Sequence, residues 1–317
     1  MPYDVVQLAS MGDAVDAQLA QHYRVYRLWD EAAPIEKLRR GEGEGARAVV
    51  TSVRRGLSRE VMQALPELRA VCSWGVGYET LDVDAAVARS IVVANTPDVL
   101  DDCVADLAWA LLLTAARRTA VGDRYVKGGQ WRTIGAFPLS TRVWGKRMGV
   151  LGMGRIGRAI ADRATGFKME VRYNNRRERP DTPYSFEPSL VELANWADFL
   201  VIACPGGAAT HHLVNAEVIR ALGPTGIVVN IARGTVIDQV ALLDALACGT
   251  LGGAGLDVLD QEPKVPAPFA TMDQVALMPH VGSATIETRA DMSQLVFDNV
   301  DAFFKTGRVL TPVSETA

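Results

Sequence analysis

Short apolar runs alternate with amphipathic stretches along almost the whole chain, and no other feature constrains the fold as strongly. The apolar runs have the length of buried strands, and the stretches between them can form helices or crossover loops. This alternation is typical of βαβ units, in which crossovers join parallel strands. The sequence therefore predicts an α/β protein built on doubly wound parallel sheets. At 317 residues the chain is long enough for two domains, each with its own core.

The expected strands form two groups that are separated along the chain. The first group, enough for one small sheet, comprises Val5–Ala9, Ala46–Val53, Leu68–Ser73 and Ile91–Ala94. The second group, enough for a six-stranded sheet, comprises Arg147–Leu151, Glu170–Tyr173, Phe199–Cys204, Ile227–Ile231, Gly253–Leu256 and Val275–Met278. Two long helices flank the second group. One begins near Asp102, and the other begins near Ser283 or Thr285 and ends at Gly307.

Charge and hydropathy restrict the class of partner. The chain has 33 Lys and Arg against 37 Asp and Glu, a net charge of −4, and it has no long basic run. A small ligand is therefore favoured over nucleic acid or an anionic membrane surface. The longest strongly apolar stretch, Leu107–Ala116, is about half of the roughly 20 residues that a membrane-spanning helix needs.

The cysteines and the N-terminal residues favour a cytoplasmic protein. Four cysteines lie far apart and form no CxxC pair, so we expect reduced thiols rather than a zinc site or disulfides: Cys72, Cys103, Cys204 and Cys248. No metal site is predicted. The first residues have neither a basic segment nor a following apolar one, so no secretory signal is expected.

A glycine-rich turn follows the expected strand Arg147–Leu151 and opens a helical stretch. Its sequence is Gly152-Met153-Gly154-Arg155-Ile156-Gly157, a GxGxxG motif in a strand–turn–helix context. Gly152 permits a tight turn, Gly154 permits a pyrophosphate to approach the backbone, and Gly157 permits close packing of helix on strand. The helix N-terminus adds N–H donors and a positive dipole end. We therefore expect this turn, including Arg155 and Ile156, to bind a dinucleotide.

The end of the next strand bears on which dinucleotide is bound. An NAD site normally has an Asp or Glu there for the ribose 2′-hydroxyl, but this chain continues after Tyr173 with Asn174-Asn175-Arg176-Arg177-Glu178-Arg179. Amides and cations suit a 2′-phosphate. We therefore predict NADP(H) in preference to NAD(H), with contacts from Asn175, Arg176 and Arg177. The alternative is a solvated basic turn, because arginines are common on surface loops.

Three polar residues each lie just beyond an apolar strand of the second group: Arg233, Glu262 and His280. Ligands bind at this edge of doubly wound sheets. Each residue has an alternative interpretation, as a surface ion pair, a solvated loop acid or a hydrogen-bonded edge histidine respectively. Together, after a dinucleotide motif, they favour hydride transfer to a 2-oxoacid.

Hydride transfer to a ketone places negative charge on oxygen, so the reaction needs a proton donor and a cation. His280 is the expected donor. Glu262 would favour its protonated form and fix its tautomer. Arg233 would hold the carboxylate and carbonyl oxygens in a fork geometry that lysine cannot reproduce.

The motifs around these residues resemble those of the D-isomer-specific 2-hydroxyacid dehydrogenase family. They are Asn230-Ile231-Ala232-Arg233-Gly234, Gly255-Leu256-Asp257-Val258 followed by Glu262-Pro263, and Pro279-His280-Val281-Gly282-Ser283. Other segments are similar to the NADPH-dependent hydroxyphenylpyruvate and hydroxypyruvate/glyoxylate reductase branch: Thr96-Pro97-Asp98-Val99-Leu100, Gly129-Gln130-Trp131, Leu139-Ser140-Thr141 and Leu310-Thr311-Pro312-Val313. The similarity covers nearly the whole chain.

The resemblance implies two Rossmann-like or flavodoxin-like domains. A discontinuous substrate domain would comprise residues 1–98 and 286–317, and residues 99–285 would form the coenzyme domain and a homodimer interface. The resemblance also places the substrate carboxylate on the backbone of Val76 and Gly77. Further cofactor contacts are implied at Cys204, Pro205, Thr210, Ile231, Ala232, Asp257 and Ser283.

Two positions depart from the pattern of the branch. Asp101 stands where the branch usually has Thr, and a carboxylate near a pyrophosphate is repulsive, so either Asp101 points away or this cofactor contact is lost. Relatives can insert a tryptophan into the partner's site from the segment after Trp131, where this chain has Ile134 and Phe137.

The aromatic residues Trp74 and Tyr78 lie close in sequence to Val76 and Gly77, and core packing is an alternative explanation for both of them.

The sequence thus predicts a reductase that uses NADPH to convert hydroxypyruvate, glyoxylate or an aryl pyruvate to the D-hydroxy acid. One alternative is an NAD-dependent enzyme like phosphoglycerate dehydrogenase, which the basic turn at Arg176 and Arg177 disfavours. The other is a dinucleotide-sensing protein of the corepressor type, since the fold alone does not establish turnover.

Overall fold

The computed structural model describes residues 3–31 and 33–317 and divides into two compact units. The first contains the chain up to Leu100 together with Thr285–Ala317, and the second contains Asp101–Ala284. Both units are built on parallel sheets, so the predicted α/β class is confirmed. Among the described residues, no helix is long and apolar enough to cross a membrane.

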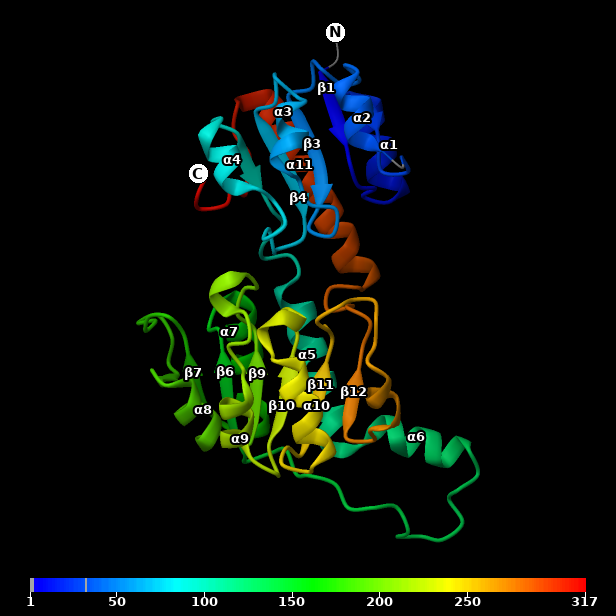
Figure 1. Cartoon of the computed structure of the whole chain (residues 1–317), viewed down its shortest axis with the longest axis vertical. Coiled ribbons are helices and arrows are strands. Elements are labelled where there is room, and N and C mark those ends of the chain that lie inside the picture. Colours follow the sequence, from blue (N-terminus) through cyan, green and yellow to red (C-terminus); the bar gives the residue numbers. More distant parts are fainter. Residues whose placement is uncertain (1–2, 32) are drawn as a thin grey trace. The chain divides into compact units, whose positions relative to one another are not determined.

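The first unit has a five-stranded sheet with the order β2-β1-β3-β4-β5. Its strands are β1 (Asp4–Gln7), β2 (Arg24–Arg27), β3 (Ala48–Ser52), β4 (Ala70–Trp74) and β5 (Val92–Ala94). Its helices are α1 (Asp13–His22), α2 (Pro34–Arg39), α3 (Arg59–Gln63), α4 (Val83–Ala88) and α11 (Ile286–Thr306). Figure 1 shows the C-terminal α11 packed beside this N-terminal sheet.

Side chains that alternate along the strands bury two cores in the first unit, one on each face of the sheet. Val5 faces the core that α1 and α11 cover, and its neighbour Val6 faces the core under α2, α3 and α4. The C-terminal segment closes the edge at β5, where Val313 donates its backbone N–H to the carbonyl of Val93 at 2.8 Å. The tail therefore belongs to the same unit as the first strands.

The second unit has a seven-stranded sheet with the order β12-β11-β10-β9-β6-β7-β8. Its strands are β6 (Arg147–Leu151), β7 (Glu170–Asn174), β8 (Ser185–Phe186), β9 (Phe199–Ile202), β10 (Ile227–Asn230), β11 (Gly253–Leu256) and β12 (Val275–Leu277). Its helices are α5 (Asp101–Arg117), α6 (Thr119–Lys127), α7 (Arg155–Ala164), α8 (Leu190–Trp196), α9 (Ala216–Leu222) and α10 (Gln239–Ala247). Four short 3-10 turns complete it: η1 (Thr165–Phe167), η2 (Ala208–Thr210), η3 (Gly234–Val236) and η4 (Ala267–Thr271).

Helices cover both faces of the seven-stranded sheet, as a doubly wound topology requires. α8, α9 and α10 contribute Leu193, Val218 and Leu242 to one core, and α5 contacts β10 and β11 as well as α7. After α6, residues 128–145 run along the outside of the unit before β6 begins; we call this segment the arm (Figure 1).

Several predicted elements are confirmed, and one strand of each sheet was missed. α11 begins after Thr285, whose Oγ1 accepts a hydrogen bond from the N–H of Thr288, and it ends before Gly307 with a left-handed φ of 76°. α5 begins at Asp101, one residue before the predicted start. The sheet predicted to have six strands has seven, because β8 was missed, and β2 was missed in the first unit.

Candidate active site

The carboxyl ends of neighbouring strands bring most of the predicted site residues to one edge of the seven-stranded sheet. Because β12, β11, β10, β9, β6 and β7 are successive neighbours, the loops that follow them leave the same edge. Ordered by preceding strand, the predicted residues are Gly152–Gly157 after β6, Asn175–Arg177 after β7, Cys204, Pro205 and Thr210 after β9, Ile231, Ala232 and Arg233 after β10, Asp257 and Glu262 after β11, and His280 and Ser283 after β12. Val76 and Gly77 follow β4 in the first unit.

His280 and Glu262 form a direct pair. Nδ1 of His280 lies 2.7 Å from Oε2 of Glu262, and both side chains are half-buried. The other carboxylate oxygen, Oε1 of Glu262, accepts a hydrogen bond from the N–H of Leu259 at 3.2 Å. The carboxylate is thus held in place and can fix which ring nitrogen of His280 carries a proton.

Buried Asp257 holds the backbone of the histidine loop. Its two carboxylate oxygens accept hydrogen bonds from the N–H groups of Val281, at 2.8 Å, and Gly282, at 2.9 Å. The N–H of His280 itself bonds to the Asp257 carbonyl at 2.8 Å. Burial raises the pKa of Asp257 above its usual range, while the two backbone hydrogen bonds oppose this shift. The resemblance implied a cofactor contact for Asp257; the structure gives it this anchoring role.

Arg233 is positioned by Asn230, a residue that we did not assign to the site. Oδ1 of buried Asn230 accepts from the N–H of Ala232 at 3.0 Å, and its Nδ2 donates to the carbonyl of Arg233 at 2.9 Å. Asn230 therefore shapes the turn from which the guanidinium extends. Its place at the last position of a buried strand is the sequence signal that could have identified it, since a buried amide needs nearby polar partners.

The glycine turn fits a bound dinucleotide. Gly152 has a φ of 101°, a conformation that favours glycine, and a Cβ at Gly157 would collide with the carbonyl oxygen of Gly152. A Cβ at Gly154 would project into open space, which leaves room for a phosphate to approach the backbone. α7 begins immediately afterwards at Arg155 and presents its N-terminus.

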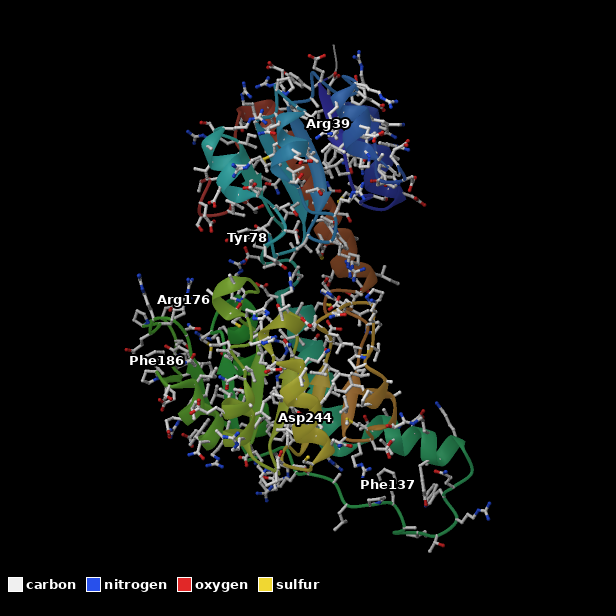
Figure 2. All side chains as sticks on the ribbon, viewed as in Figure 1. Arg39, Tyr78, Phe137, Arg176, Phe186 and Asp244 are labelled. Atoms are coloured by element: carbon white, nitrogen blue, oxygen red, sulfur yellow. The ribbon has the colours of Figure 1, made fainter. Side chains whose placement is uncertain are left out.

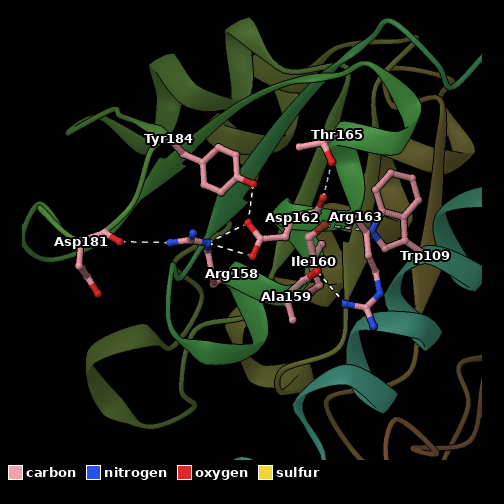
Figure 3. Close-up of polar contacts among 9 residues, drawn as sticks. All are labelled: Trp109, Arg158, Ala159, Ile160, Asp162, Arg163, Thr165, Asp181 and Tyr184. Atoms are coloured by element: carbon pink, nitrogen blue, oxygen red, sulfur yellow. Dashed lines mark hydrogen bonds and ion pairs between the residues drawn. The ribbon is translucent and has the colours of Figure 1, made fainter.

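A network ties α7 to the segment after β7 (Figure 3). Nε of Arg158 contacts the Asp162 carboxylate at 2.8 Å, and another guanidinium nitrogen, NH1, donates to the Asp181 carbonyl at 3.2 Å. The hydroxyl of Tyr184 donates to Asp162 at 2.6 Å. On the opposite side of α7, Trp109 of α5 donates its indole N–H to the carbonyl of Ile160 at 3.0 Å.

The polar residues of the turn after β7 differ in whether they have a partner in the structure. Oδ1 of Asn175 accepts from the N–H of Met153 at 2.7 Å, so Asn175 ties this turn to the glycine turn. Arg179 pairs with Asp181, with the closer contact at 2.7 Å, and this partner raises the pKa of Arg179. Arg176 and Arg177 are exposed, and neither has an ion-pair partner within the part of the chain that the structure describes. Figure 2 labels Arg176.

Several other predicted residues are buried or lie in loops that hydrogen bonds hold. The hydroxyl of Thr210 donates to the carbonyl of Pro205 at 2.8 Å and so closes the loop after β9. Burial raises the pKa of the Cys204 thiol to about 11. In the first unit, Nδ2 of Asn95 donates to the carbonyl of Val76 at 2.7 Å, which holds the loop that carries Val76 and Gly77.

Trp74 and Tyr78 have packing partners in the first unit, in line with the alternative interpretation. The guanidinium of Arg289 lies over the Trp74 ring at 4.3 Å. Tyr78 packs against the core under α2, α3 and α4, and its hydroxyl donates to Glu315 at 3.2 Å (Figure 2).

A parallel sheet with a glycine turn and an Arg, Glu and His beyond its carboxyl edge is an arrangement typical of dinucleotide-dependent dehydrogenases. The NAD-binding domain of D-isomer specific 2-hydroxyacid dehydrogenases matches residues 109–282 of this sequence. The chain belongs to this family, and the predicted resemblance is confirmed.

Relatives match over nearly their whole length. The chain is 43% identical to hydroxyphenylpyruvate reductase from Plectranthus scutellarioides, with 98% of each chain covered. It is 40% identical to a glyoxylate/hydroxypyruvate reductase A from Arabidopsis thaliana, again with 98% of each covered. It is also similar to the structure of an NADPH-dependent glyoxylate/hydroxypyruvate reductase from Sinorhizobium meliloti in complex with NADP and malonate. That match has a TM-score of 0.92 and 39% identity and covers 100% of this chain and 98% of the other.

Proposed function

We propose that this chain is a reductase that uses NADPH to convert a small 2-oxoacid to the D-2-hydroxy acid. The observation that carries the proposal is the 2.7 Å pair between Nδ1 of His280 and Oε2 of Glu262, at the same sheet edge as the glycine turn. With Nδ1 directed at a carboxylate, the other ring nitrogen, Nε2, is the expected proton donor. Hydroxypyruvate, glyoxylate and aryl pyruvates are the proposed substrates, and the names of the relatives support this class.

A nicotinamide dinucleotide held at the glycine turn, Gly152–Gly157, would supply the hydride that reduces the carbonyl carbon of the substrate. Nε2 of His280 donates a proton to the carbonyl oxygen, which would otherwise carry the developing negative charge. Glu262 orients the ring through its contact with Nδ1. The neutral imidazole then takes up a proton from solvent, and the cycle can repeat.

Substrate binding is assigned to Arg233 and to the backbone of Val76 and Gly77. The guanidinium of Arg233 offers a planar fork of donors, which matches the carboxylate and carbonyl oxygens of a 2-oxoacid. The N–H groups of Val76 and Gly77 are proposed to bind the substrate carboxylate. Asn230 and Asn95 support these assignments, because they hold the turns that carry Arg233 and Val76.

The proposed preference for NADP(H) rests on Arg176 and Arg177. Both cations are exposed in the turn after β7, which Asn175 ties to the glycine turn. Arg179 is not one of the proposed contacts, because Asp181 pairs with its guanidinium. A 2′-phosphate is a dianion with strong acceptors, so two exposed guanidinium groups suit it better than they suit a ribose diol.

A homodimer through the coenzyme domain, taken as residues 99–285, is part of the proposal. The arm exposes large apolar side chains to solvent, and two of them are almost fully exposed: Ile134 at 92% and Leu139 at 98%. Such a patch is typical of a protein–protein interface. Phe137 packs against Tyr125 of α6 in the same chain, with ring centroids 5.4 Å apart, so α6 supports the arm (Figure 2).

We further propose a cytoplasmic location. None of the four cysteines forms a disulfide in the described part of the chain, and burial raises the pKa of the Cys72 thiol to about 12. Reduced thiols persist in the cytoplasm, where thiol-reducing systems operate.

The test is a panel of four 2-oxoacids, each assayed with NADPH and with NADH: hydroxypyruvate, glyoxylate, pyruvate and 4-hydroxyphenylpyruvate. We expect oxidation of NADPH with at least one substrate and a higher kcat/KM with NADPH than with NADH. Dinucleotide binding without turnover of any substrate would reject the reductase and favour a sensing protein. Faster turnover with NADH would reject the cofactor preference alone.

The role of His280 is tested with the same substrates. His280→Ala should lower kcat by about 10²–10⁴-fold, the usual contribution of a positioned proton donor. The matched control is His22→Ala, which removes an exposed histidine at the end of α1 in the first unit and should leave kcat unchanged. If His280→Ala keeps near-normal turnover, the proton donor is another group.

A further inference from the structure

The N-terminal residue of α5 forms an ion pair with the N-terminal residue of α7. Oδ2 of Asp101 lies 3.3 Å from Nε of Arg155, and the Asp101 side chain is only 12% exposed while that of Arg155 is 53% exposed. Arg155 directly follows Gly154, the residue whose open side accommodates a phosphate. The Asp101 carboxylate is therefore held next to Arg155, and Arg155 directly follows the proposed pyrophosphate-binding residue Gly154 in the sequence.

This ion pair is not needed to hold the two helices together. Further along the same interface, NH2 of Arg163 contacts Asp102 at 3.0 Å and Asp106 at 2.9 Å. Trp109 of α5 also bonds to the Ile160 carbonyl of α7 at 3.0 Å. These contacts join α5 to α7 independently of Asp101.

We propose that Asp101 weakens dinucleotide binding by offsetting the positive charge of Arg155 at the pyrophosphate site. The inference rests on the cofactor-binding part of the proposed function. A carboxylate held beside Arg155 competes with phosphate oxygens for the guanidinium and repels the negative charge that the ligand brings. The sequence left open whether Asp101 points away or a cofactor contact is lost; in the structure its carboxylate engages Arg155.

The effect belongs to the pyrophosphate, which NADPH and NADH share. Removing the Asp101 charge should therefore tighten the binding of both dinucleotides by the same factor. The preference between them depends on Arg176 and Arg177 and should not change. The common change in the two Kd values tests the role of Asp101, and the ratio of the two Kd values tests the proposed preference for NADP(H).

The experiment measures the Kd of NADPH and of NADH by fluorescence titration of the full-length protein without substrate. Asp101→Asn keeps the size of the side chain and removes its charge, and Asp101→Thr is a second uncharged variant with a smaller side chain. We expect both variants to lower both Kd values by about 3- to 30-fold.

The matched control is Asp102→Asn. Asp102 is the next residue of α5, its side chain is 86% exposed, and it pairs with Arg163 rather than with Arg155. This variant should leave both Kd values within about twofold, as expected for an exposed pair. Thermal unfolding of every variant checks that the fold is intact.

Three results would overturn the proposal. Unchanged Kd values in both folded Asp101 variants would mean that its charge does not act on the ligand. Weaker binding would mean that Asp101 orients Arg155 for phosphate binding. Tighter binding of NADPH but not of NADH would move the effect from the pyrophosphate to the 2′-phosphate. A Kd ratio that favours NADH in the wild-type protein would reject the proposed cofactor preference and leave the role of Asp101 standing.

Discussion

His280 adopts a left-handed backbone conformation, with a φ of 55°, and buried Asp257 explains how it is maintained. Side chains other than glycine rarely adopt this region, and doing so costs about 1–3 kcal/mol. Two carboxylate oxygens and one carbonyl of Asp257 bind three consecutive N–H groups, from His280 to Gly282. These hydrogen bonds stabilise the turn and fix the direction in which the imidazole leaves the backbone.

Asp257→Asn should disturb this turn at nearly constant volume. The new amide NH2 faces a backbone N–H, so one hydrogen bond is lost and a buried donor is left unsatisfied, which costs about 1–3 kcal/mol of unfolding free energy. We also expect kcat to fall at least about tenfold, because the position of the proton donor becomes less well defined. Urea unfolding and steady-state kinetics measure the two effects.

The control for this variant is Asp260→Asn, a nearby substitution at a half-buried residue outside the histidine turn. It should change neither quantity appreciably. If Asp257→Asn unfolds at the wild-type urea concentration and turns over normally, Asp257 does not anchor the catalytic histidine.

At the scale of elements, the long helices that bury one face could be predicted from the sequence, whereas elements without a buried face were missed. α5 and α11 were predicted because their apolar residues recur at helical spacing, and both bury one face. β2, β8 and α6 were missed. β2 and β8 are edge strands, β8 has only two residues, and every residue of the two strands is exposed or half-buried. α6 buries none of its residues. Without a buried face there is no periodic apolar pattern to detect.

The same contrast applies within the site. Arg233, Glu262 and His280 could be placed at one edge because parallel strands end together. The anchoring roles of Asn230 and Asp257, and the pairing of Arg155 with Asp101, depend on side-chain directions in the folded loops. Sequence spacing does not determine these directions.

Two glycines of the strand–turn–helix element should respond differently to the same substitution. In Gly157→Ala, the new Cβ would collide with the backbone carbonyl of Gly152, so α7 must shift away from β6. We expect a loss of about 1–3 kcal/mol of stability together with weaker dinucleotide binding. In Gly154→Ala, the Cβ enters open space, so stability should stay near the wild-type value while dinucleotide binding weakens.

Thermal unfolding without ligand, followed by fluorescence titration with NADPH, separates the two outcomes. Gly166→Ala is the control, because a Cβ there also meets open space but lies at the far end of α7, in η1. Normal NADPH affinity in Gly154→Ala would mean that the ligand does not approach the turn at this residue.

At the scale of the whole molecule, the chain leaves its first unit at Leu100 and returns to it at Thr285. The sequence predicted this discontinuity with boundaries at 98/99 and 285/286. The returning segment is integrated into the first unit through α11 and through Thr311, whose hydroxyl donates to the Asn95 carbonyl at 2.6 Å. The second unit is thus an insertion, and it carries the arm that we propose as the surface for a second copy of the chain.

The arm gives the last prediction. Leu139→Asp places a charge on a side chain that is 98% exposed in the single chain, so it should leave the fold of the monomer intact while disrupting an interface that buries this residue. Light scattering coupled to size exclusion should show a dimer for the wild-type protein and a monomer for the variant. Val240→Asp is the control: Val240 lies on α10 and is 70% exposed, so its substitution should leave the dimer unchanged. A wild-type monomer, or a dimer that persists in Leu139→Asp, would contradict the proposed interface, because apolar side chains this exposed are expected to be covered where the copies meet.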